Sequence, residues 1–213
     1  WPKVIVAGGS EDTLWVSNWD SESVARLTRT TGAIEEIIAV GGQPRGMVLT
    51  EDDRYLWVCL FSTGDIEIID TAENRVVDSI GLPAGAARHI VANPDRTKLY
   101  YSDMYHGTIG IIDPETRTVV RTRRIGINVN TIEIDPQGRY LYASERGRNN
   151  RESYLIPGPE FGRIFVLDPN TLETVQVLYG RHQPTGLAVS PSGRLVATTD
   201  FLDDNLTVYR VAR

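Results

Sequence analysis

The sequence has 213 residues, enough for one sizeable domain, and its 41% hydrophobic and 23% charged residues are typical of a folded globular protein. A formal net charge of −6 argues against a nucleic-acid partner, and the lack of a long apolar run argues against a membrane-spanning segment. A single cysteine excludes an internal disulfide and an all-cysteine metal site.

One five-residue pattern recurs along the chain and sets its organisation. It reads LWVSN at 14–18, LWVCL at 56–60, LYYSD at 99–103, LYASE at 141–145 and VATTD at 196–200. An interval of about 42 residues is typical of four-stranded propeller blades and also of helical armadillo-type repeats. The periodicity within each repeat decides between the two.

Each repeat contains short stretches rich in β-branched and aromatic residues, which predict β-strands. In the first repeat the predicted strands are Lys3–Ala7, Thr13–Asn18, Ser23–Leu27 and Ile34–Val40. In the second repeat they are Gly46–Leu49, Tyr55–Leu60, Asp65–Ile69 and Arg75–Ile80. No window of ten or more residues shows helical spacing of its apolar residues. The sequence therefore predicts an all-β protein, a β-propeller of four-stranded antiparallel blades.

Two kinds of turn separate the predicted strands. Between the first and second strands lie EDD (51–53), NPD (93–95), DPQG (135–138) and SPSG (190–193). After the third strand lie DTAE (70–73), DPET (113–116) and DPNT (168–171). Proline presets the backbone angle of the second turn position, and Asp, Asn and Ser side chains accept hydrogen bonds from nearby amides.

The fifth repeat supplies only three predicted strands, the last being Asn205–Tyr209, so the outer strand of its blade is missing. The approximate blade bounds are 1–41, 42–85, 86–128, 129–183 and 184–213, within one propeller domain. The open edge favours self-association. Three explanations are open: a longer propeller of which this is one part, five blades that close without strand exchange, or a second chain that fills the gap. Because the sequence begins at Trp1 and not at Met, we expect the first.

The five motifs resemble the motif that gives the YVTN-type β-propeller family its name. The flanking segments QPRGMVLTEDDRYLWV (43–58) and QPTGLAVSPSGRLVAT (183–198) are similar to the same family's repeat, and the resemblance covers the whole chain. It implies a β-propeller and, because the family includes surface-layer and periplasmic binding proteins, a periplasmic or extracellular location in the cell envelope. Related propellers serve as lactonases, amine dehydrogenase subunits and haem-d1 proteins, so the fold leaves the activity open.

A propeller brings residues about 42 positions apart together on one face. The connections that lead into the inner strands and those between the second and third strands emerge on that face. The first kind of connection carries Arg45, Arg88, His89 and Asn130, and the second strands end in Asp103, Glu145 and Asp200. We expect these side chains to form a site for a small anionic ligand or a protein partner.

The longer last interval reflects an insertion of about a dozen residues after the second strand of the fourth repeat, from Arg146 to Phe161. Long loops in compact domains are often functional. Within it, Arg148 is a candidate donor to a carboxylate or phosphate. A salt-bridged, solvated loop beside Asp200 and Asp203 is the alternative.

Several other histidine, aromatic and cysteine side chains are expected to have structural roles. The histidines His89, His106 and His182 lack the spacing of a metal site, so neither a metal nor a cofactor is expected. The residues that follow the second strands are expected to cover neighbouring blades, and stacking of their aromatic rings on a planar ligand is the alternative. These residues are Trp19, Phe61, Met104, Arg146 and Phe201. Within the second strands, Trp15, Trp57, Tyr100 and Tyr142 are expected to pack between blades, and Cys59 to be a buried structural thiol.

Two classes of function follow. The regular repeats and the lack of a catalytic motif favour a non-enzymatic binding or scaffolding propeller. The alternative that the resemblance suggests is a lactonase-like hydrolase, in which a divalent cation is held by Asp103, Glu145, Asp200 and His89 and the substrate by Arg45 or Arg88. A propeller subunit of a redox enzyme ranks below both. Bonds from the three carboxylates to arginines or backbone amides would favour the scaffold.

Overall fold

A computed structural model describes residues 1–9, 12–50, 53–83 and 85–211. The described chain folds into nineteen strands in five antiparallel sheets. This described part contains no helix, and hence none that is long and apolar enough to cross a membrane. The first residues of the predicted turn at 51–53 lie outside the described part.

Each sheet is a meander in which consecutive strands pair. The first sheet contains β1 (Pro2–Ala7), β2 (Thr13–Asn18), β3 (Ser23–Thr28) and β4 (Ile34–Ala39). The second contains β5 (Pro44–Thr50), β6 (Tyr55–Leu60), β7 (Ile66–Asp70) and β8 (Arg75–Ile80). The third contains β9 (Ala87–Ala92), β10 (Leu99–Asp103), β11 (Thr108–Asp113) and β12 (Thr118–Arg124).

The last two sheets differ from each other by one strand. The fourth contains β13 (Val129–Ile134), β14 (Leu141–Glu145), β15 (Arg163–Leu167) and β16 (Thr174–Tyr179). The fifth contains β17 (Pro184–Val189), β18 (Leu195–Asp200) and β19 (Asn205–Arg210). The strands with predicted bounds, which are those of the first two blades and the last strand of the fifth, agree with the observed ones to within two residues at either end. The fifth blade has three strands in the described chain, as predicted.

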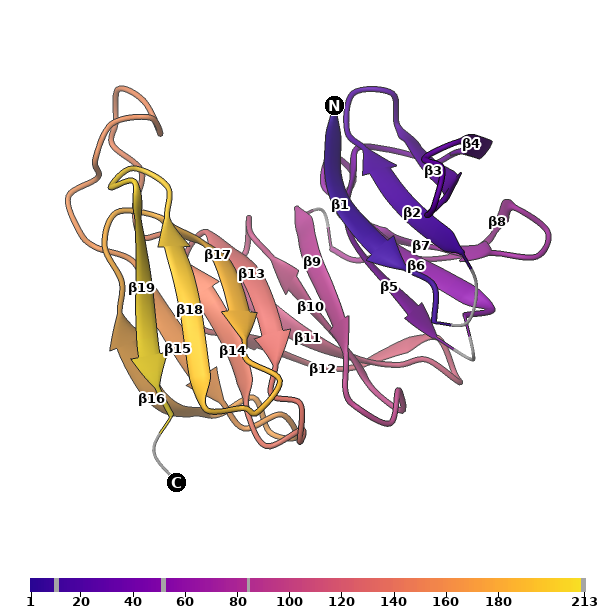
Figure 1. Ribbon diagram of the computed structural model, residues 1–213. Helices are drawn as coiled ribbons and strands as arrows, with labels where there is room; N and C mark the ends of the chain where they lie inside the picture. The colour runs from indigo at the N-terminus through magenta and orange to yellow at the C-terminus, as the bar shows by residue number, and fades with distance from the viewer. Residues whose placement is uncertain (10–11, 51–52, 84, 212–213) are drawn as a thin grey trace.

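The five sheets follow one another around an open arc, with the N-terminal sheet and the C-terminal sheet at its two ends (Figure 1). The first strand of every sheet lies innermost, and β1, β5, β9, β13 and β17 each contact the inner strand of the neighbouring sheet. This arrangement of antiparallel blades confirms the predicted β-propeller fold.

One hydrophobic cluster fills each joint between neighbouring blades. Each of these clusters contains the aromatic residue of one second strand, in the order Trp15, Trp57, Tyr100 and Tyr142. All four aromatic side chains are buried, as expected for packing residues. Burial of these large apolar surfaces is the main contribution that holds adjacent blades together.

The turns after the third strands have the predicted chemistry. Asp70, Asp113 and Asp168 each accept hydrogen bonds from the backbone N–H groups two and three residues later, at 2.8–3.1 Å. These bonds satisfy amides that the tight turn leaves without a strand partner. The aspartates therefore explain why the chain reverses there.

A hydroxyl group links neighbouring blades at the centre of two second strands. Ser17 Oγ donates to the carbonyl of Arg45 at 2.9 Å, and Ser102 Oγ donates to the carbonyl of Asn130 at 2.6 Å. Cys59 occupies the same position in β6 and is fully buried, and burial raises the pKa of its thiol. The expectation of a buried, unreactive thiol is confirmed.

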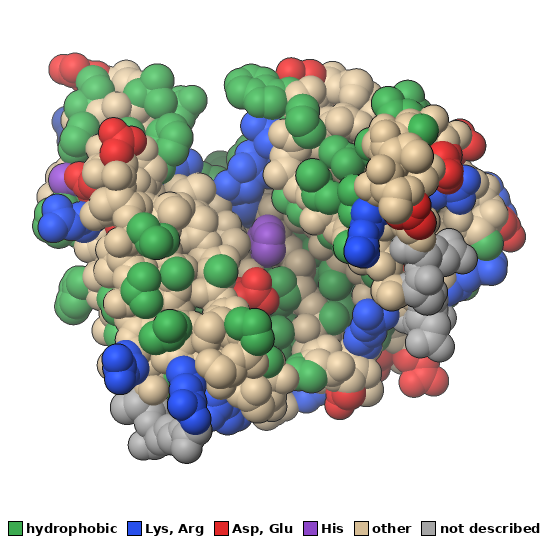
Figure 2. Space-filling view, in the orientation of Figure 1, with side chains coloured by type: hydrophobic (Ala, Val, Ile, Leu, Met, Phe, Trp, Pro, Cys, Tyr) green, Lys and Arg blue, Asp and Glu red, His purple; other side chains and the backbone are tan. Residues whose placement is uncertain are grey.

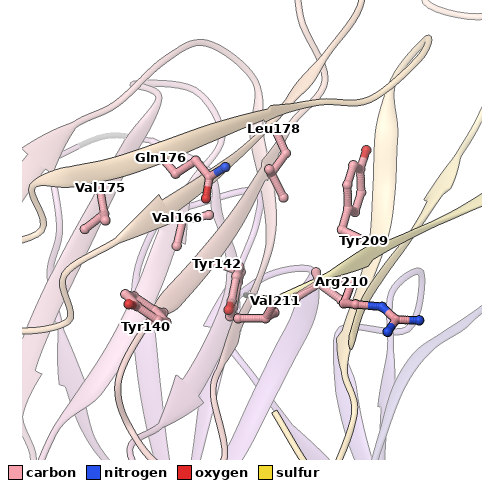
Figure 3. A pocket seen from close by; sticks show the side chains of 10 residues that line it. Tyr140, Tyr142, Val166, Val175, Gln176, Leu178, Tyr209, Arg210 and Val211 are labelled. Atoms are coloured by element: carbon pink, nitrogen blue, oxygen red, sulfur yellow. The ribbon is translucent and has the colours of Figure 1, made fainter. Parts of the chain in front are cut away.

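A small pocket of about 160 Å³ lies at the outer side of the contact between the last two blades, where β16 faces β19 (Figure 3). Its floor is apolar and includes Val166, Leu178 and Val196. Tyr209 donates a hydrogen bond to the carbonyl of Tyr179 at 2.8 Å across this joint. The pocket lies beside the outer edge of β19, which pairs only with β18 in the described chain.

Candidate functional site

All five blades build the same structure at the end of the molecule where the inner strands begin, which we call the rim. There the N–H group of the residue after the second strand donates to a carbonyl before or at the start of the inner strand. The pairs are Trp19–Trp1, Phe61–Gln43, Met104–Ala86, Arg146–Asn128 and Phe201–Gln183, at 2.8–3.2 Å. These equivalent contacts place the residue after each second strand beside the start of the inner strand of the same blade.

Each inner strand also has an irregular register near the rim, where it leaves regular pairing with the second strand. Such bulges turn side chains away from the plane of the sheet and are common beside binding sites. In β5, β9 and β13 the irregular segments carry Arg45, Arg88, His89 and Asn130. The bulges therefore present the predicted site residues at the rim.

The Arg45 side chain is held by aromatic rings from two blades. Its guanidinium carbon lies 5.0 Å from the ring centre of Trp19 and 5.9 Å from that of Phe61. The two rings lie 5.1 Å apart. Trp19 and Phe61 therefore do more than cover the blades, because they fix a guanidinium through cation–π contacts.

Arg146 is held in the same way on the other side of the rim. Its guanidinium carbon lies 5.3 Å from the ring of Phe201 and 6.0 Å from that of Tyr154, which belongs to the insertion. In the described part of the chain neither Arg45 nor Arg146 forms an ion pair, and the Nε atom of each is buried without a partner. Among the described residues, Arg45 and Arg146 thus stand at the rim without a protein counterion.

Polar groups without partners also lie between these two arginines along the rim. The backbones of Gly46 and His89 approach so closely that a Cβ on Gly46 would lie 2.5 Å from the His89 Cα. His89 Nδ1 and the Nδ2 of fully buried Asn130 have no hydrogen-bond partner among the described residues. Arg88, at the start of β9, is only 7% exposed. We call Arg45, Arg88, His89, Asn130 and Arg146 the arginine cluster.

The charges of this cluster act on one another. Burial lowers the pKa of Arg45 to about 10, with the nearby Arg146 charge acting in the same direction. Burial also lowers the pKa of Arg146. Desolvation of two neighbouring cations is unfavourable unless an anion compensates it. Basic side chains and a histidine are visible in the depression between the first and last blades (Figure 2).

The three carboxylates at the ends of the second strands have other partners. Asp103 accepts the N–H groups of Ala86, Tyr105 and His106 and contacts His106 Nδ1 at 2.6 Å. Glu145 accepts the N–H of Ile127 and two bonds from Arg163 at 2.7 and 2.8 Å. These bonds fasten the connection that enters each blade to the second strand of the same blade.

Asp200 has the same function in the last blade, where it accepts the N–H of Arg181 at 3.0 Å. The connections pass so close to these carboxylates that a Cβ on Gly85 would collide with Asp103, and one on Gly126 with Glu145. We expected these carboxylates to share one ligand site with the arginines, but their oxygen atoms instead bond to backbone amides and to Arg163 and His106. The carboxylates satisfy buried amides, which is a structural task.

The insertion folds back over the rim. Arg148 pairs with Glu160 at 3.1 Å and is largely exposed, so its side chain is occupied within the loop and not directed at the arginine cluster. The buried Gln183 donates from Nε2 to the carbonyl of Tyr154 at 2.6 Å, which ties the loop to the last blade. The insertion therefore contains a solvent-exposed salt bridge, formed by Arg148 and Glu160. The residue of the insertion that contacts the arginine at the rim is Tyr154 and not Arg148.

The remaining histidines form separate pairs with aspartates. His106 contacts Asp103, and His182 Nδ1 lies 3.1 Å from Asp203. Among the described residues, no group of three His, Cys, Asp or Glu side chains is arranged to hold a metal ion. The donor set proposed for a divalent cation, Asp103, Glu145, Asp200 and His89, is thus not gathered at one point.

Sequence reasoning missed the role of Arg146. It aligned this residue with the aromatic positions of other blades, and the structure shows that it is the cation which two such aromatics surround. The break in the aligned set, an arginine among Trp19, Phe61, Met104 and Phe201, was the available signal.

His89 makes the stability of the fold depend on pH. Burial lowers the pKa of His89 to about 4, and the Arg45 charge acts in the same direction against a hydrogen bond to the Ile132 backbone. The unfolded chain takes up this proton near pH 6.5, so the contribution to stability is present above pH 6.5 and is lost as the pH falls to about 4. We expect the free energy of unfolding to drop by about 2–3 kcal/mol over this range.

Urea titrations of the wild type and of His89→Gln at several pH values from about 4 to 7 measure this effect. The difference between the two proteins should shrink as the pH falls. Parallel pH profiles would show that His89 titrates normally in the folded protein.

Comparisons with known proteins agree with the fold. No protein-family model matches the chain. It is 34% identical to antigen Lp49 of Leptospira interrogans, over 99% of this chain and 48% of that protein. It is 25% identical to seven-bladed beta-propeller protein Rv1057 of Mycobacterium tuberculosis, over 66% of this chain and 36% of that protein. The chain thus spans about half or less of the length of these relatives.

Two solved structures share the fold at lower identity. Hydrazine synthase of Kuenenia stuttgartiensis superposes with a TM-score of 0.80 at 21% identity, over 92% of this chain and 55% of that chain. A candidate 6-phosphogluconolactonase of Bacteroides uniformis superposes with a TM-score of 0.77 at 16% identity, over 97% and 65%. At these identities the likeness concerns the fold alone.

Proposed function

We propose, on the premise that the chain is a β-propeller protein, that it is a non-enzymatic binding propeller which takes an anionic ligand at the rim. The observation that carries this proposal is the pair Arg45 and Arg146, two partly buried guanidiniums that are fixed by aromatic rings and lack a counterion among the described residues. Guanidinium groups bind carboxylates and phosphates through charge-assisted hydrogen bonds.

The energetic reasoning is that a desolvated cation is stabilised most by an anion that enters the same site. Cation–π contacts with Trp19 and Phe201 hold the guanidiniums in place before binding, so little side-chain entropy is lost when a ligand arrives. Asn130 Nδ2, buried and without a partner in the described chain, is a further donor. Binding would satisfy polar atoms that are otherwise costly to bury.

The hydrolase alternative receives less support. Asp103, Glu145 and Asp200 are engaged by backbone amides, by Arg163 and by His106, and these contacts keep them from serving as open metal ligands. The resemblance of the fold to a candidate lactonase, at 16% identity, gives no catalytic residue to this chain. A redox role has no supporting contact among the described residues.

We also propose that the five blades are part of a larger ring. The first blade exposes Ile34 and Ile37 and the last blade exposes Leu206 and Val208, each by more than half, on faces that resemble the buried joints of the inner blades. The name of the relative Rv1057 gives a ring of seven blades. Further blades, or a second copy at the open edge of β19, would bury these residues. A periplasmic or extracellular location is part of this proposal.

Calorimetric titration with inorganic phosphate tests the anion site. We expect the wild type to bind phosphate and Arg45→Met to bind it about 10- to 100-fold more weakly, because one charge-assisted hydrogen bond contributes about 1.5–3 kcal/mol. Arg148→Met is the matched control, since Arg148 pairs with Glu160 in solvent, and should bind phosphate as the wild type does. Absence of phosphate binding to the wild type, or equal binding by Arg45→Met, would refute the proposed function.

A further inference from the structure

We infer that the rim selects a ligand with two anionic groups joined by a short segment that carries a hydroxyl group, such as a hydroxylated dicarboxylate. This inference rests on the proposed function and names the class of ligand. It follows from the order of the groups around the rim: a cation, an acceptor, a donor and a second cation.

The two cations stand on different blades, and aromatic rings hold each of them in place. Arg45 begins the inner strand of the second blade and is held by Trp19 and Phe61. Arg146 follows the second strand of the fourth blade and is held by Phe201 and Tyr154. The third blade lies between these positions. A ligand with an anionic group at each end can compensate both guanidiniums at once.

The middle of the site is formed by His89 and Asn130. Gly46 has no side chain, which lets the backbone that carries Arg45 lie directly against His89. Ser102 Oγ donates to the Asn130 carbonyl at 2.6 Å and so joins the third blade to the inner strand of the fourth. Arg146 is placed beside this strand because its N–H donates to the Asn128 carbonyl. These contacts place the backbone segments that carry the four residues one after another, from the second blade to the fourth.

The hydrogen-bonding roles in the middle are complementary. Desolvation lowers the pKa of His89, which favours the neutral ring near pH 7, and a hydrogen bond to the Ile132 backbone favours a proton on the nitrogen that makes this bond. Its other nitrogen, Nδ1, has no partner among the described residues and is left as an acceptor. Asn130 Nδ2 is a donor without a partner there. One hydroxyl group can donate to His89 Nδ1 and accept from Asn130 Nδ2 at the same time.

The described part of the protein supplies no substitute for such a ligand. The carboxylates nearest the rim, Asp103, Glu145 and Asp200, accept backbone amides. The anionic groups and the hydroxyl that would satisfy the cluster must then come from a bound molecule. A simple anion is expected to bind less tightly, because it would leave one guanidinium and two buried polar atoms uncompensated.

Calorimetric titration with malate, succinate and 3-hydroxybutyrate separates the parts of this inference. Malate has two carboxylates and a hydroxyl, succinate lacks the hydroxyl, and 3-hydroxybutyrate lacks the second carboxylate. We expect malate to bind at least about tenfold more tightly than either of the others. In His89→Phe and in Asn130→Ala the advantage of malate over succinate should disappear. In Arg146→Met the advantage of malate over 3-hydroxybutyrate should disappear.

Arg148→Met again serves as the control and should keep the wild-type order of affinities, and circular dichroism verifies that each variant is folded. If the wild type binds 3-hydroxybutyrate or phosphate as tightly as malate, the inferred ligand class is wrong while the anion site stands. If it binds succinate as tightly as malate, the roles of His89 and Asn130 are wrong. If it binds none of these anions, the proposed function itself fails.

Discussion

Replacement of Trp57 by alanine is expected to lower the free energy of unfolding by about 3–5 kcal/mol. The Trp57 side chain is 1% exposed and lies in the cluster between the second and third blades. Its Nε1 donates to Thr50 Oγ1 at 2.9 Å, so truncation also leaves a buried hydroxyl without its partner. The cavity cannot close by local collapse, because strands on both sides are fixed by their own sheets.

Urea denaturation followed by circular dichroism measures this effect, since removal of a tryptophan changes the fluorescence directly. Trp1→Ala is the control, because Trp1 is 71% exposed and its loss should change stability by less than about 0.5 kcal/mol. A loss below about 1 kcal/mol for Trp57→Ala would contradict the assignment of Trp57 to the joint between blades.

Replacement of Glu145 by alanine is expected to lower the free energy of unfolding by about 2–4 kcal/mol. Glu145 is fully buried and accepts two bonds from Arg163 and one from the N–H of Ile127. The change leaves that amide without a partner and separates the fourth blade from the connection that enters it. Arg163 is partly exposed and can be rehydrated, which keeps the loss below the upper limit for buried pairs.

The ion pair between Arg148 and Glu160 provides a matched control in the same region. It lies in solvent, so Glu160→Ala should change stability by less than about 1 kcal/mol. Glu145→Gln keeps an acceptor for Ile127 and should lose less than Glu145→Ala. Equal effects of Glu145→Ala and Glu160→Ala would show that Glu145 does not fasten the blade.

The strands could be predicted from the sequence because each repeat combines a local strand pattern with its own turn residues. Alternating apolar residues and the Asp turns at Asp70, Asp113 and Asp168 specify the meander before any long-range contact is known. The period of about 42 residues then places the aromatic residues of the second strands at equivalent joints. Local and global preferences agree at these positions.

The site could be predicted only in part, because the repeat gives the position of a residue and not the direction of its side chain. Arg45, His89 and Asn130 lie at the rim as expected. Asp103 and Glu145 also lie there, but their carboxylates turn toward amides of the incoming connection, a choice set by backbone geometry that the period does not encode. Arg146 was overlooked because the aromatic rings around it come from a different blade and from the insertion.

Different residues at the rim stabilise the fold and form the proposed binding site. Buried carboxylates bond to the connection that enters each of the last three blades, whereas the arginine cluster has no counterion among the described residues. The aromatic residues connect the two tasks, since they bury apolar surface and also fix the guanidiniums. This division explains why a regular repeat can carry a site that differs from one blade to the next.

A crystal structure of the protein grown with malate gives the most direct test of this account. We predict density for one ligand that contacts the guanidiniums of both Arg45 and Arg146, with its hydroxyl group beside His89 Nδ1 and Asn130 Nδ2. A structure in which Arg45 or Arg146 instead pairs with a carboxylate of the protein, and the rim holds no malate, would contradict it.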